Sequence, residues 1–484
     1  MNYTTIPEMF YSIINANPDK NILNYKLNDT WNSINGLTVR DSVENISSAL
    51  CYHNITKNDK VAILSTTTYK WALCDYGILC VGAVTTTVYP TLLDEQILYI
   101  LNNSESKIVF VENMVQCNKI LNILEQCNLL KLIVLMDDSY KGNNGNIINL
   151  NSFISNGKKY KNENNLNIQE LSEKVNKDDL VTLIYTSGTT GIPKGVMLSH
   201  QNIISNLIAV RKMQKDFHNE RFLSFLPLSH ILERMAGHFF ALSLEPEIYY
   251  AENLETVGEN MAEVSPSIVI CVPRFFEKMH DKIMSGLASA PKSKIKLFNW
   301  ALKLGKDITN IKHAGRSPNF LMKFKYIIAD KIIYSKVRAK LGGNIKFFIS
   351  GGAPLSRNVA EFFSGIGITI LEGYGLTETS PVLTSNTPEF IRFGTVGKAL
   401  TNVDIKIADD GEILAKGPNI MLGYYKNPEA TKKVIDTEGW FHTGDIGELD
   451  NDGFLKITDR KKSIIVTSAG KNIAPAPLEN ALNG

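Results

Sequence analysis

The chain lacks the features that define several broad classes of protein. Its six cysteines among 484 residues show no Cys-x-x-Cys spacing, which disfavours a disulfide framework and favours reduced thiols in a cytosolic protein. An excess of charge of one sign is also missing, because 51 Lys and Arg residues face 49 Asp and Glu residues. A formal net charge of +2 gives no electrostatic reason to expect binding to a nucleic acid, so we expect no nucleic-acid partner. From the cysteines we expect a cytoplasmic protein.

A long, uninterrupted hydrophobic run is absent as well. The most apolar stretch, residues 71–90, is interrupted by Asp75 and by the run Thr85-Thr86-Thr87, and this pattern predicts a buried helix followed by a strand rather than a membrane span. Residues 1–20 lack the basic and long apolar segments of a secretory signal. We therefore expect no transmembrane segment, with peripheral contact to a membrane left open.

What the sequence does contain is a recurring α/β pattern. Short β-branched runs alternate with helical segments from Val61 onward, at residues 61–65, 107–111, 132–136, 180–184, 268–272 and 345–350. This alternation predicts an α/β fold with parallel-type sheets flanked by helices. After Phe390, short strands and turn signals such as Asp409-Asp410-Gly411 predict a β-rich subdomain.

Two segments depart from that pattern. Residues 138–179 are rich in Asn, Lys, Gly and Ser, and we expect a surface excursion with a little local structure there. Residues 285–341 are rich in Lys and prone to form helices, and Trp300, Phe324 and Tyr326 fall on amphipathic spacings. We interpret this insertion as solvated helices with a buried stripe, in preference to a membrane-binding element.

The most informative segment is YTSGTTGIPKGVMLSH at residues 185–200, which follows the apolar run at 180–184. It brings hydroxyl groups, flexible glycine amides and one cation into a single loop, and such groups can hold a polyphosphate. These residues are Thr186, Ser187, Gly188, Thr189, Thr190, Gly191 and Lys194. The loop is not a Walker A sequence, because no Gly-Lys pair in the chain precedes Ser or Thr, so a P-loop NTPase is disfavoured.

This loop resembles the phosphate loop of the adenylate-forming (ANL, AMP-binding) superfamily, which contains acyl-CoA synthetases, luciferases and peptide-synthetase adenylation domains. Further matching segments follow in the family's order: LPLSHILER at 226–234, SGGAPL at 350–355, EGYGLTET at 372–379, GWFHTGD at 439–445 and DRKK at 459–462. The LPLSHILER segment is most similar to the long-chain fatty acyl-CoA synthetase branch. Together the matches run from about Val61 to Glu479.

The resemblance implies a task for individual residues. His230 would lie near the acyl carboxylate, Tyr374 near the adenine and Thr377 at the α-phosphate. Asp445 would bind both ribose hydroxyls, because an ionised carboxylate can receive two donors at once. Arg460 would reach the ribose or the phosphates as a permanent cation.

Grouped by task, the implied residues form four sets. The catalytic residues would be Thr186, His230 and Glu378. The metal would be held by Thr186 and Glu378, because their hard oxygen atoms suit Mg²⁺. The hinge residue would be Lys462. The ATP- or AMP-binding residues would be Thr186, Ser187, Gly188, Thr189, Thr190, Gly191, Lys194, Gly351, Gly352, Ala353, Glu372, Gly373, Tyr374, Gly375, Thr377, Asp445 and Arg460.

The resemblance also implies a domain organisation. Residues 1–460 would form a large AMP-binding domain, with two parallel-type sheets flanked by helices to about residue 390 and a β-rich subdomain from about 391 to 458. Residues 461–484 would be the hinge and the start of a small C-terminal domain. The family's C-terminal lysine would lie beyond Gly484, so we expect this 484-residue form to bind ATP or AMP but to adenylate fatty acid poorly. Ser463 stands where the family usually has an acidic residue.

The implied reaction uses ATP, Mg²⁺ and CoA and has two steps. A fatty acid carboxylate attacks the α-phosphate of ATP to give acyl-AMP and pyrophosphate, and the CoA thiol then displaces AMP. Two kinds of alternative stay open: another adenylating enzyme, such as an acyl- or aryl-CoA ligase or a peptide-synthetase domain, and a non-catalytic nucleotide- or acyl-binding protein. No motif marks the acyl chain length or the oligomeric state.

Overall fold

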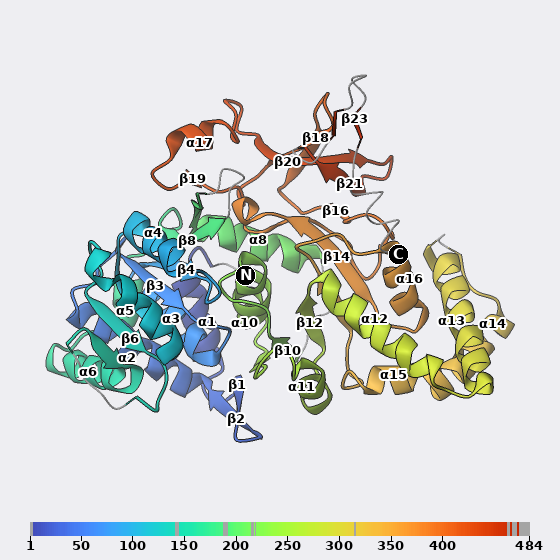
Figure 1. Cartoon of the computed structure of the whole chain (residues 1–484), viewed down its shortest axis with the longest axis horizontal. Coiled ribbons are helices and arrows are strands. Elements are labelled where there is room, and N and C mark those ends of the chain that lie inside the picture. Colours follow the sequence, from blue (N-terminus) through green and yellow to red (C-terminus); the bar gives the residue numbers. More distant parts are fainter. Residues whose placement is uncertain are drawn as a thin grey trace.

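A computed structural model of the chain describes residues 3–140, 145–186, 192–213, 217, 219–313, 316–461, 465–466 and 472–473. Two sheets flanked by helices stand side by side in Figure 1, and a smaller antiparallel sheet lies above them in that view. The prediction of an α/β fold with two parallel-type sheets and a β-rich part is thereby confirmed. The proposed domain boundaries at about 390 and 460 stay a prediction.

The first sheet contains the strand that leads into the hydroxyl- and glycine-rich loop. Its strand order is β19-β9-β8-β4-β3-β5-β6-β7, and the strands from β8 to β7 run parallel. Because both faces of these strands are covered, β6 is buried throughout and reads as a continuous apolar run. The strands are β3 (Lys60–Leu64), β4 (Val84–Val88), β5 (Ser106–Val111), β6 (Leu132–Leu135), β7 (Ile147–Asn149), β8 (Leu180–Thr186), β9 (Lys194–Ser199) and β19 (Gly423–Tyr424).

Helices from the first third of the chain cover this sheet (Figure 1). Side-chain caps fix where several of them begin: Thr5 accepts a hydrogen bond from Glu8 N, and Thr68 accepts one from Trp71 N. The helices are α1 (Ile6–Ala16), α2 (Gly36–Tyr52), α3 (Tyr69–Cys80), α4 (Asp94–Ser104), α5 (Met114–Ile123), the 3₁₀ turn η1 (Leu124–Gln126), α6 (Leu150–Glu163) and α7 (Ile168–Ser172). The predicted buried helix and strand at residues 71–90 are confirmed as α3 and β4.

The second sheet holds the later motifs. Its order is β16-β15-β14-β13-β12-β10-β11-β1-β2, parallel from β14 to β1, with β2, β15 and β16 antiparallel at its two edges. The strands are β1 (Asn21–Leu27), β2 (Thr30–Asn35), β10 (Arg221–Ser224), β11 (Glu247–Tyr250), β12 (Ile268–Cys271), β13 (Phe347–Ser350), β14 (Ile370–Gly375), β15 (Val382–Ser385) and β16 (Lys398–Ala399). The 3₁₀ turn η4 (Thr377–Thr379) follows β14.

Helices that belong to the second sheet fill the space between the two sheets and cover the other face. Long α8 (His200–Met213) crosses the middle of the molecule in Figure 1. The LPLSHILER segment continues into a π-helix, η2 (Arg234–Phe240), between the short helices α9 (Ile231–Glu233) and α10 (Ala241–Ser243). The remaining helices are α11 (Val257–Val264), α12 (Pro273–Ala288) and α16 (Arg357–Gly365).

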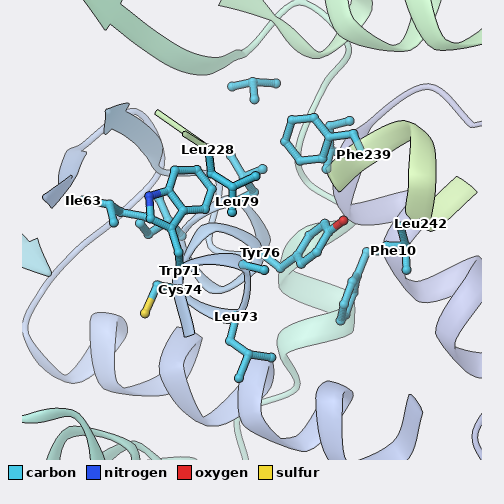
Figure 2. Close-up of a cluster of buried hydrophobic side chains, with 14 of the residues drawn as sticks. Phe10, Ile63, Trp71, Leu73, Cys74, Tyr76, Leu79, Leu228, Phe239 and Leu242 are labelled. Atoms are coloured by element: carbon cyan, nitrogen blue, oxygen red, sulfur yellow. The ribbon is translucent and has the colours of Figure 1, made fainter. Parts of the chain in front are cut away.

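One hydrophobic core is shared by the two sheets. In Figure 2, Trp71 and Tyr76 of α3 lie close to Leu228 and Phe239 of the segment that follows β10. The rings of Tyr76 and Phe239 have centroids 6.1 Å apart, and Phe10 of α1 packs on Tyr76 at 4.8 Å. These contacts hold the π-helix η2 against the first sheet, so the two sheets meet through side chains and not through paired strands.

The third sheet is antiparallel, with the order β17-β18-β20-β21. Its strands are β17 (Asp404–Ile407), β18 (Glu412–Lys416), β20 (Phe441–Leu449) and β21 (Leu455–Arg460). Between β18 and β20 the chain leaves this sheet, adds β19 to the edge of the first sheet beside β9, and forms α17 (Pro428–Lys432). Beyond β21, β22 (Ile465–Val466) pairs with β23 (Asn472–Ile473).

Residues 138–179 form more local structure than the surface excursion with a little local structure that we expected from their composition. This segment contains β7, α7 and the 14-residue helix α6. Phe153 is fully buried, and a Cβ at Gly157 would lie 2.0 Å from Asn45 O and 2.9 Å from Ala49 Cβ on α2. Helix α6 packs on α2 through a narrow face, and the close approach of the two backbones requires a glycine there instead of a large apolar residue. The polar composition of the segment therefore gave no sign of this packed face.

The predicted helices of residues 285–341 are confirmed, but the expected buried stripe is wrong in part. The segment folds as the end of α12, α13 (Lys292–His313), α14 (Phe320–Ala329), the π-helical turn η3 (Asp330–Tyr334) and α15 (Ser335–Ala339). Tyr326 packs against the core, whereas Phe324 is 53% exposed and Trp300 is 37% exposed. Among the described residues, no helix combines the length and the apolar character that crossing a bilayer requires.

Candidate active site

A cavity of about 850 Å³ lies where the ends of β8, β13 and β14 meet the third sheet. The parallel strands β13 and β14 end at the same edge of the second sheet and bring the segments after them together. The end of β8, in the first sheet, lines the same cavity, so motifs far apart in sequence share it. The predicted residues that line it are Thr186, Lys194, His230, Gly351, Gly352, Gly373, Tyr374, Gly375, Thr377, Glu378 and Arg460.

Not every predicted residue is part of the wall. Glu372 and Asp445 are buried next to lining residues, and Ala353 directly follows Gly352. The phosphate-loop residues Ser187, Gly188, Thr189, Thr190 and Gly191 and the hinge residue Lys462 lie outside the described residues. Their expected roles, like those of the residues on the wall, stay predictions.

Thr186 and Lys194 mark the two ends of the loop. They are paired across the antiparallel strands β8 and β9, so the chain leaves the sheet at Thr186 and re-enters it at Lys194 at one place on the cavity wall. Lys194 Nζ lies 5.0 Å from the centroid of the Tyr424 ring. Such a contact holds the ammonium group over an aromatic face and leaves its N–H donors available to an anion.

Glu378 is held by a residue that sequence analysis missed. Tyr424 Oη donates a 2.8 Å hydrogen bond to Glu378 Oε1, and Met421 N donates to the Glu378 carbonyl oxygen at 2.8 Å. Because β19 pairs with β9, Tyr424 contacts both Lys194 and Glu378. The sequence carried no local signal for it, since Tyr424 lies on a two-residue strand 46 positions from its partner.

Tyr374 and Asp445 form a buried pair between the second and third sheets. Tyr374 Oη donates to Asp445 Oδ2 at 2.7 Å, and Arg460 Nε lies 3.4 Å from Asp445 Oδ1. Burial raises the pKa of Asp445, opposed by the Tyr374 hydrogen bond and by the charge of Arg460. One carboxylate oxygen is therefore engaged by the tyrosine, while the other faces a largely exposed guanidinium group at the cavity.

Glu372 and Ser350 place polar atoms behind the glycine-rich turn after β13. The two residues are paired in the parallel register of β13 and β14. Burial raises the pKa of Glu372 to about 8, so its carboxyl group is protonated at neutral pH and can donate a hydrogen bond. Ser350 Oγ is buried and has no partner among the described residues. Gly352 beside them has φ +82°, a conformation that favours glycine.

His230 stands where the polar and apolar parts of the cavity meet. It caps α9, and its Nδ1 accepts a 3.1 Å hydrogen bond from Leu232 N. Burial lowers the pKa of His230, so the ring is neutral at pH 7 and carries its hydrogen on Nε2. The residue therefore offers an N–H donor without a charge.

The other half of the cavity is apolar. A π-helix closes i→i+5 hydrogen bonds, so residues four or five positions apart lie on one face. This spacing brings Met235, Ala236 and Phe240 of η2 to the cavity wall, which residues of α8 also line. The apolar lining residues that α8, α9 and η2 contribute are Val210, Met213, Ile231, Leu232, Met235, Ala236 and Phe240. Such a wall can hold an alkyl chain next to the nucleotide-sized polar part.

A buried polar cluster fixes η2 from behind and was also missed. Arg234 Nε and Nη2 bind Asp75 Oδ2 and Oδ1 of α3 at 3.0 and 2.5 Å, and both side chains are fully buried. Although burial alone raises the pKa of Asp75, the charge of Arg234 holds it below its usual value. Glu233 accepts a 2.6 Å hydrogen bond from Ser224, and burial raises its pKa to about 8. Asp75 and Arg234 are 159 positions apart in the sequence, so no local sequence pattern could link them.

At the other end of the cavity, Lys461 ties the end of β21 to β18. Its Nζ lies 2.6 Å from Asp410 Oδ2 and 2.8 Å from Glu412 Oε2. Glu412 Oε1 also accepts a 2.9 Å hydrogen bond from Gly444 N, next to Asp445. The first residue of the predicted hinge is therefore linked through Glu412 to the turn that carries Asp445.

Known proteins match this chain over most of its length. The profile of the AMP-binding enzyme family matches residues 10–425. The chain is 34% identical over 485 residues to the long-chain-fatty-acid–CoA ligase FadD15 of Mycobacterium bovis, covering 99% of this chain and 78% of that protein. It is 33% identical to the long-chain-fatty-acid–CoA ligase ACSBG2 of Homo sapiens, over 98% of this chain and 72% of the relative.

Solved structures show the same fold. The anthranilate CoA ligase AuaEII in complex with anthranoyl-AMP superposes with a TM-score of 0.76 at 17% identity, over 99% of this chain and 82% of that one. The Mycobacterium tuberculosis fatty acyl CoA synthetase superposes with a TM-score of 0.69 at 21% identity, over 99% and 83% of the two chains. With the family profile, the close relatives and the fold in agreement, the chain belongs to the AMP-binding enzyme family.

Proposed function

We propose that the chain activates a long-chain fatty acid with ATP and then joins it to CoA. In the first step a carboxylate oxygen attacks the α-phosphorus of ATP, the bond to pyrophosphate breaks, and acyl-AMP forms. In the second step the CoA thiol attacks the acyl carbonyl carbon, loses its proton, and AMP leaves. The relatives named as long-chain-fatty-acid–CoA ligases support this proposal. Cytoplasmic location and fatty acid, ATP and CoA as partners are part of it.

The observation that carries the proposal is the continuity of one cavity. Thr186, Lys194, Thr377 and Glu378 line its polar part, and the π-helix η2 with α8 lines its apolar part. An acyl-AMP has the same division, with a nucleotide at one end and an alkyl chain at the other. A protein that bound only a nucleotide would have no need of the apolar half.

The residues on the wall suit positioning and charge neutralisation, because the substrates supply both nucleophiles. Lys194 and Arg460 would oppose the phosphate charges, and the neutral Nε2–H of His230 would donate to the acyl carboxylate at the junction of the two halves. Glu378 and Thr186 present hard oxygen atoms on the same wall, which fits a magnesium ion shared with the phosphates. That ion would neutralise charge on the leaving pyrophosphate.

The test uses non-hydrolysable acyl-sulfamoyl adenosine analogues with two-carbon and sixteen-carbon acyl groups. If both halves of the cavity bind one ligand, calorimetry will show at least about tenfold tighter binding of the long analogue, because a buried alkyl chain adds favourable free energy. Equal affinity for the two would contradict a long-chain substrate and favour an aryl or short-chain ligase. Fatty-acid-dependent release of pyrophosphate from ATP separates an enzyme from a non-catalytic binding protein.

A further inference from the structure

The helical insertion of residues 285–341 lies at the end of the molecule opposite α6 (Figure 1). Helices α12, α13, α14 and α15 form this end, and their inner sides pack on a core that includes Phe298, Ala301, Ala329 and Tyr334. The outer sides of these helices contribute nothing to the cavity described above. They are available for a different task.

Helix α14 exposes an apolar stripe. Phe320, Leu321, Phe324 and Ile327 are 84%, 58%, 53% and 64% exposed, and we call them the outer stripe of α14. Their spacing of i, i+1, i+4 and i+7 places them on one face of the helix. Single exposed apolar residues are ordinary, but a continuous exposed apolar surface marks a binding site.

The same segment concentrates positive charge. From Lys292 to Leu341 the sequence has thirteen Lys and Arg residues against two Asp residues, a net charge of +11. The whole chain carries +2, so all other residues together carry −9. Exposed Lys323, Lys325 and Lys331 border the outer stripe, and in the described part of the chain none of them has an acidic group within 4 Å. The positive charge beside the outer stripe is therefore local and is not paired with described carboxylates, although Lys306 and Arg338 of the same segment do pair with Glu361 and Asp330.

We propose that the outer stripe of α14 and its bordering lysines dock the protein on an anionic lipid bilayer. A helix with apolar side chains on one face and lysines beside them lies in the plane of the membrane interface, with the apolar face among the acyl chains. Lysine side chains are long enough to keep their ammonium groups at the level of the lipid phosphates. An anionic bilayer therefore offers acyl chains to the apolar stripe of α14 and phosphates to its lysines.

Charge and hydrophobicity together disfavour other occupants. A second copy of this chain would bring two segments of +11 against each other, which is repulsive. A nucleic acid would neutralise the lysines but would leave Phe320 and Ile327 in contact with water or phosphate. An anionic bilayer accommodates both sets of side chains. The inference does not depend on the reaction proposed above, because its test measures binding and not turnover.

The first experiment is flotation of the full chain with phosphatidylcholine vesicles, with and without phosphatidylglycerol. We expect binding only when phosphatidylglycerol is present, and at least about tenfold weaker binding for the variant Phe320→Ser/Phe324→Ser/Ile327→Ser. The matched control is Leu93→Ser/Leu254→Ser/Phe390→Ser, whose side chains are 71%, 70% and 66% exposed and lie outside the insertion. All six side chains are exposed, so the substitutions leave the packed core intact.

The second experiment tests the charge. Lys323→Gln/Lys325→Gln should weaken binding to the anionic vesicles by roughly tenfold or more, and added salt should weaken binding of the native chain. Lys159→Gln/Lys432→Gln, at positions that are 75% exposed elsewhere, should change it little. The proposal is overturned if the native chain does not bind anionic vesicles, or if the outer-stripe variant binds them as well as the native chain. It is equally overturned if sedimentation shows a dimer that the outer-stripe variant abolishes.

Discussion

Tyr424 stands between Glu378 and Lys194, with its hydroxyl 2.8 Å from Glu378 Oε1 and its ring centroid 5.0 Å from Lys194 Nζ. The tyrosine reaches this position because the chain leaves the third sheet after β18 and forms β19, which pairs with β9 of the first sheet. Residues beside a metal ligand orient it, and their loss typically weakens metal binding by about 10- to 100-fold. If Glu378 holds Mg²⁺, Tyr424 sets the direction of its carboxylate.

The first prediction concerns this contact. Tyr424→Phe removes the hydroxyl and keeps the ring over Lys194, so we expect roughly tenfold weaker binding of Mg·ATP with little change in the affinity for metal-free AMP. Calorimetry with the two ligands measures the difference. Tyr425→Phe is the control, because Tyr425 Oη bonds Glu105 at 3.1 Å and does not line the cavity. Equal losses for both ligands would show that Tyr424 supports the fold of the site and not the metal.

A second prediction concerns pH and stability. The pKa of Glu233 is raised to about 8 by burial, from an ordinary value of 4.5. Between these values the unfolded chain releases the proton that the folded chain keeps, so the free energy of unfolding falls as pH rises, by about 1.4 kcal/mol per pH unit for this group. Glu233→Gln keeps the shape and cannot ionise, and it should remove that part of the pH dependence. Urea unfolding at pH 5.5 and 7.5 measures it.

The comparison for this experiment is Glu429→Gln, because Glu429 is 77% exposed and its pairing with Lys432 is at the surface. That variant should keep the native pH dependence. A Glu233→Gln protein with an unchanged slope would mean that Glu233 is already ionised in the folded chain.

The sequence predicted what is local or continuous and missed what is brought together by the fold. Strands such as β6 are buried on both faces and read as apolar runs, and the glycine- and hydroxyl-rich turns follow such strands directly. The rule that parallel strands end at the same edge of a sheet brings together the segments after β13 and β14 but not the end of β8, which lies in the other sheet. Tyr424 and the pair Asp75–Arg234 depend on contacts over 46 and 159 positions, for which composition and periodicity contain no signal.

A third prediction tests the buried ion pair behind the acyl half of the cavity. Asp75→Asn leaves the Arg234 guanidinium group buried without a counter-charge, and we expect a loss of about 3–5 kcal/mol in the free energy of unfolding. Adding Arg234→Met removes the stranded charge and should restore much of that loss. Urea unfolding of the single and double variants measures the coupling. A double variant no more stable than Asp75→Asn alone would contradict this account.

The last prediction addresses the length of the acyl chain. Ala236 is 5% exposed and lines the cavity on the π-helix η2, next to Met235 and in the same wall as Phe240. Ala236→Leu puts three more carbon atoms into the apolar half, so a sixteen-carbon acyl-sulfamoyl adenosine should bind at least about tenfold more weakly, because overpacking a filled cavity costs about 1–3 kcal/mol. The two-carbon analogue and AMP should bind as before, since they do not reach this wall. Unequal effects on the long and short ligands would place the alkyl chain along η2, whereas a uniform loss would place it elsewhere.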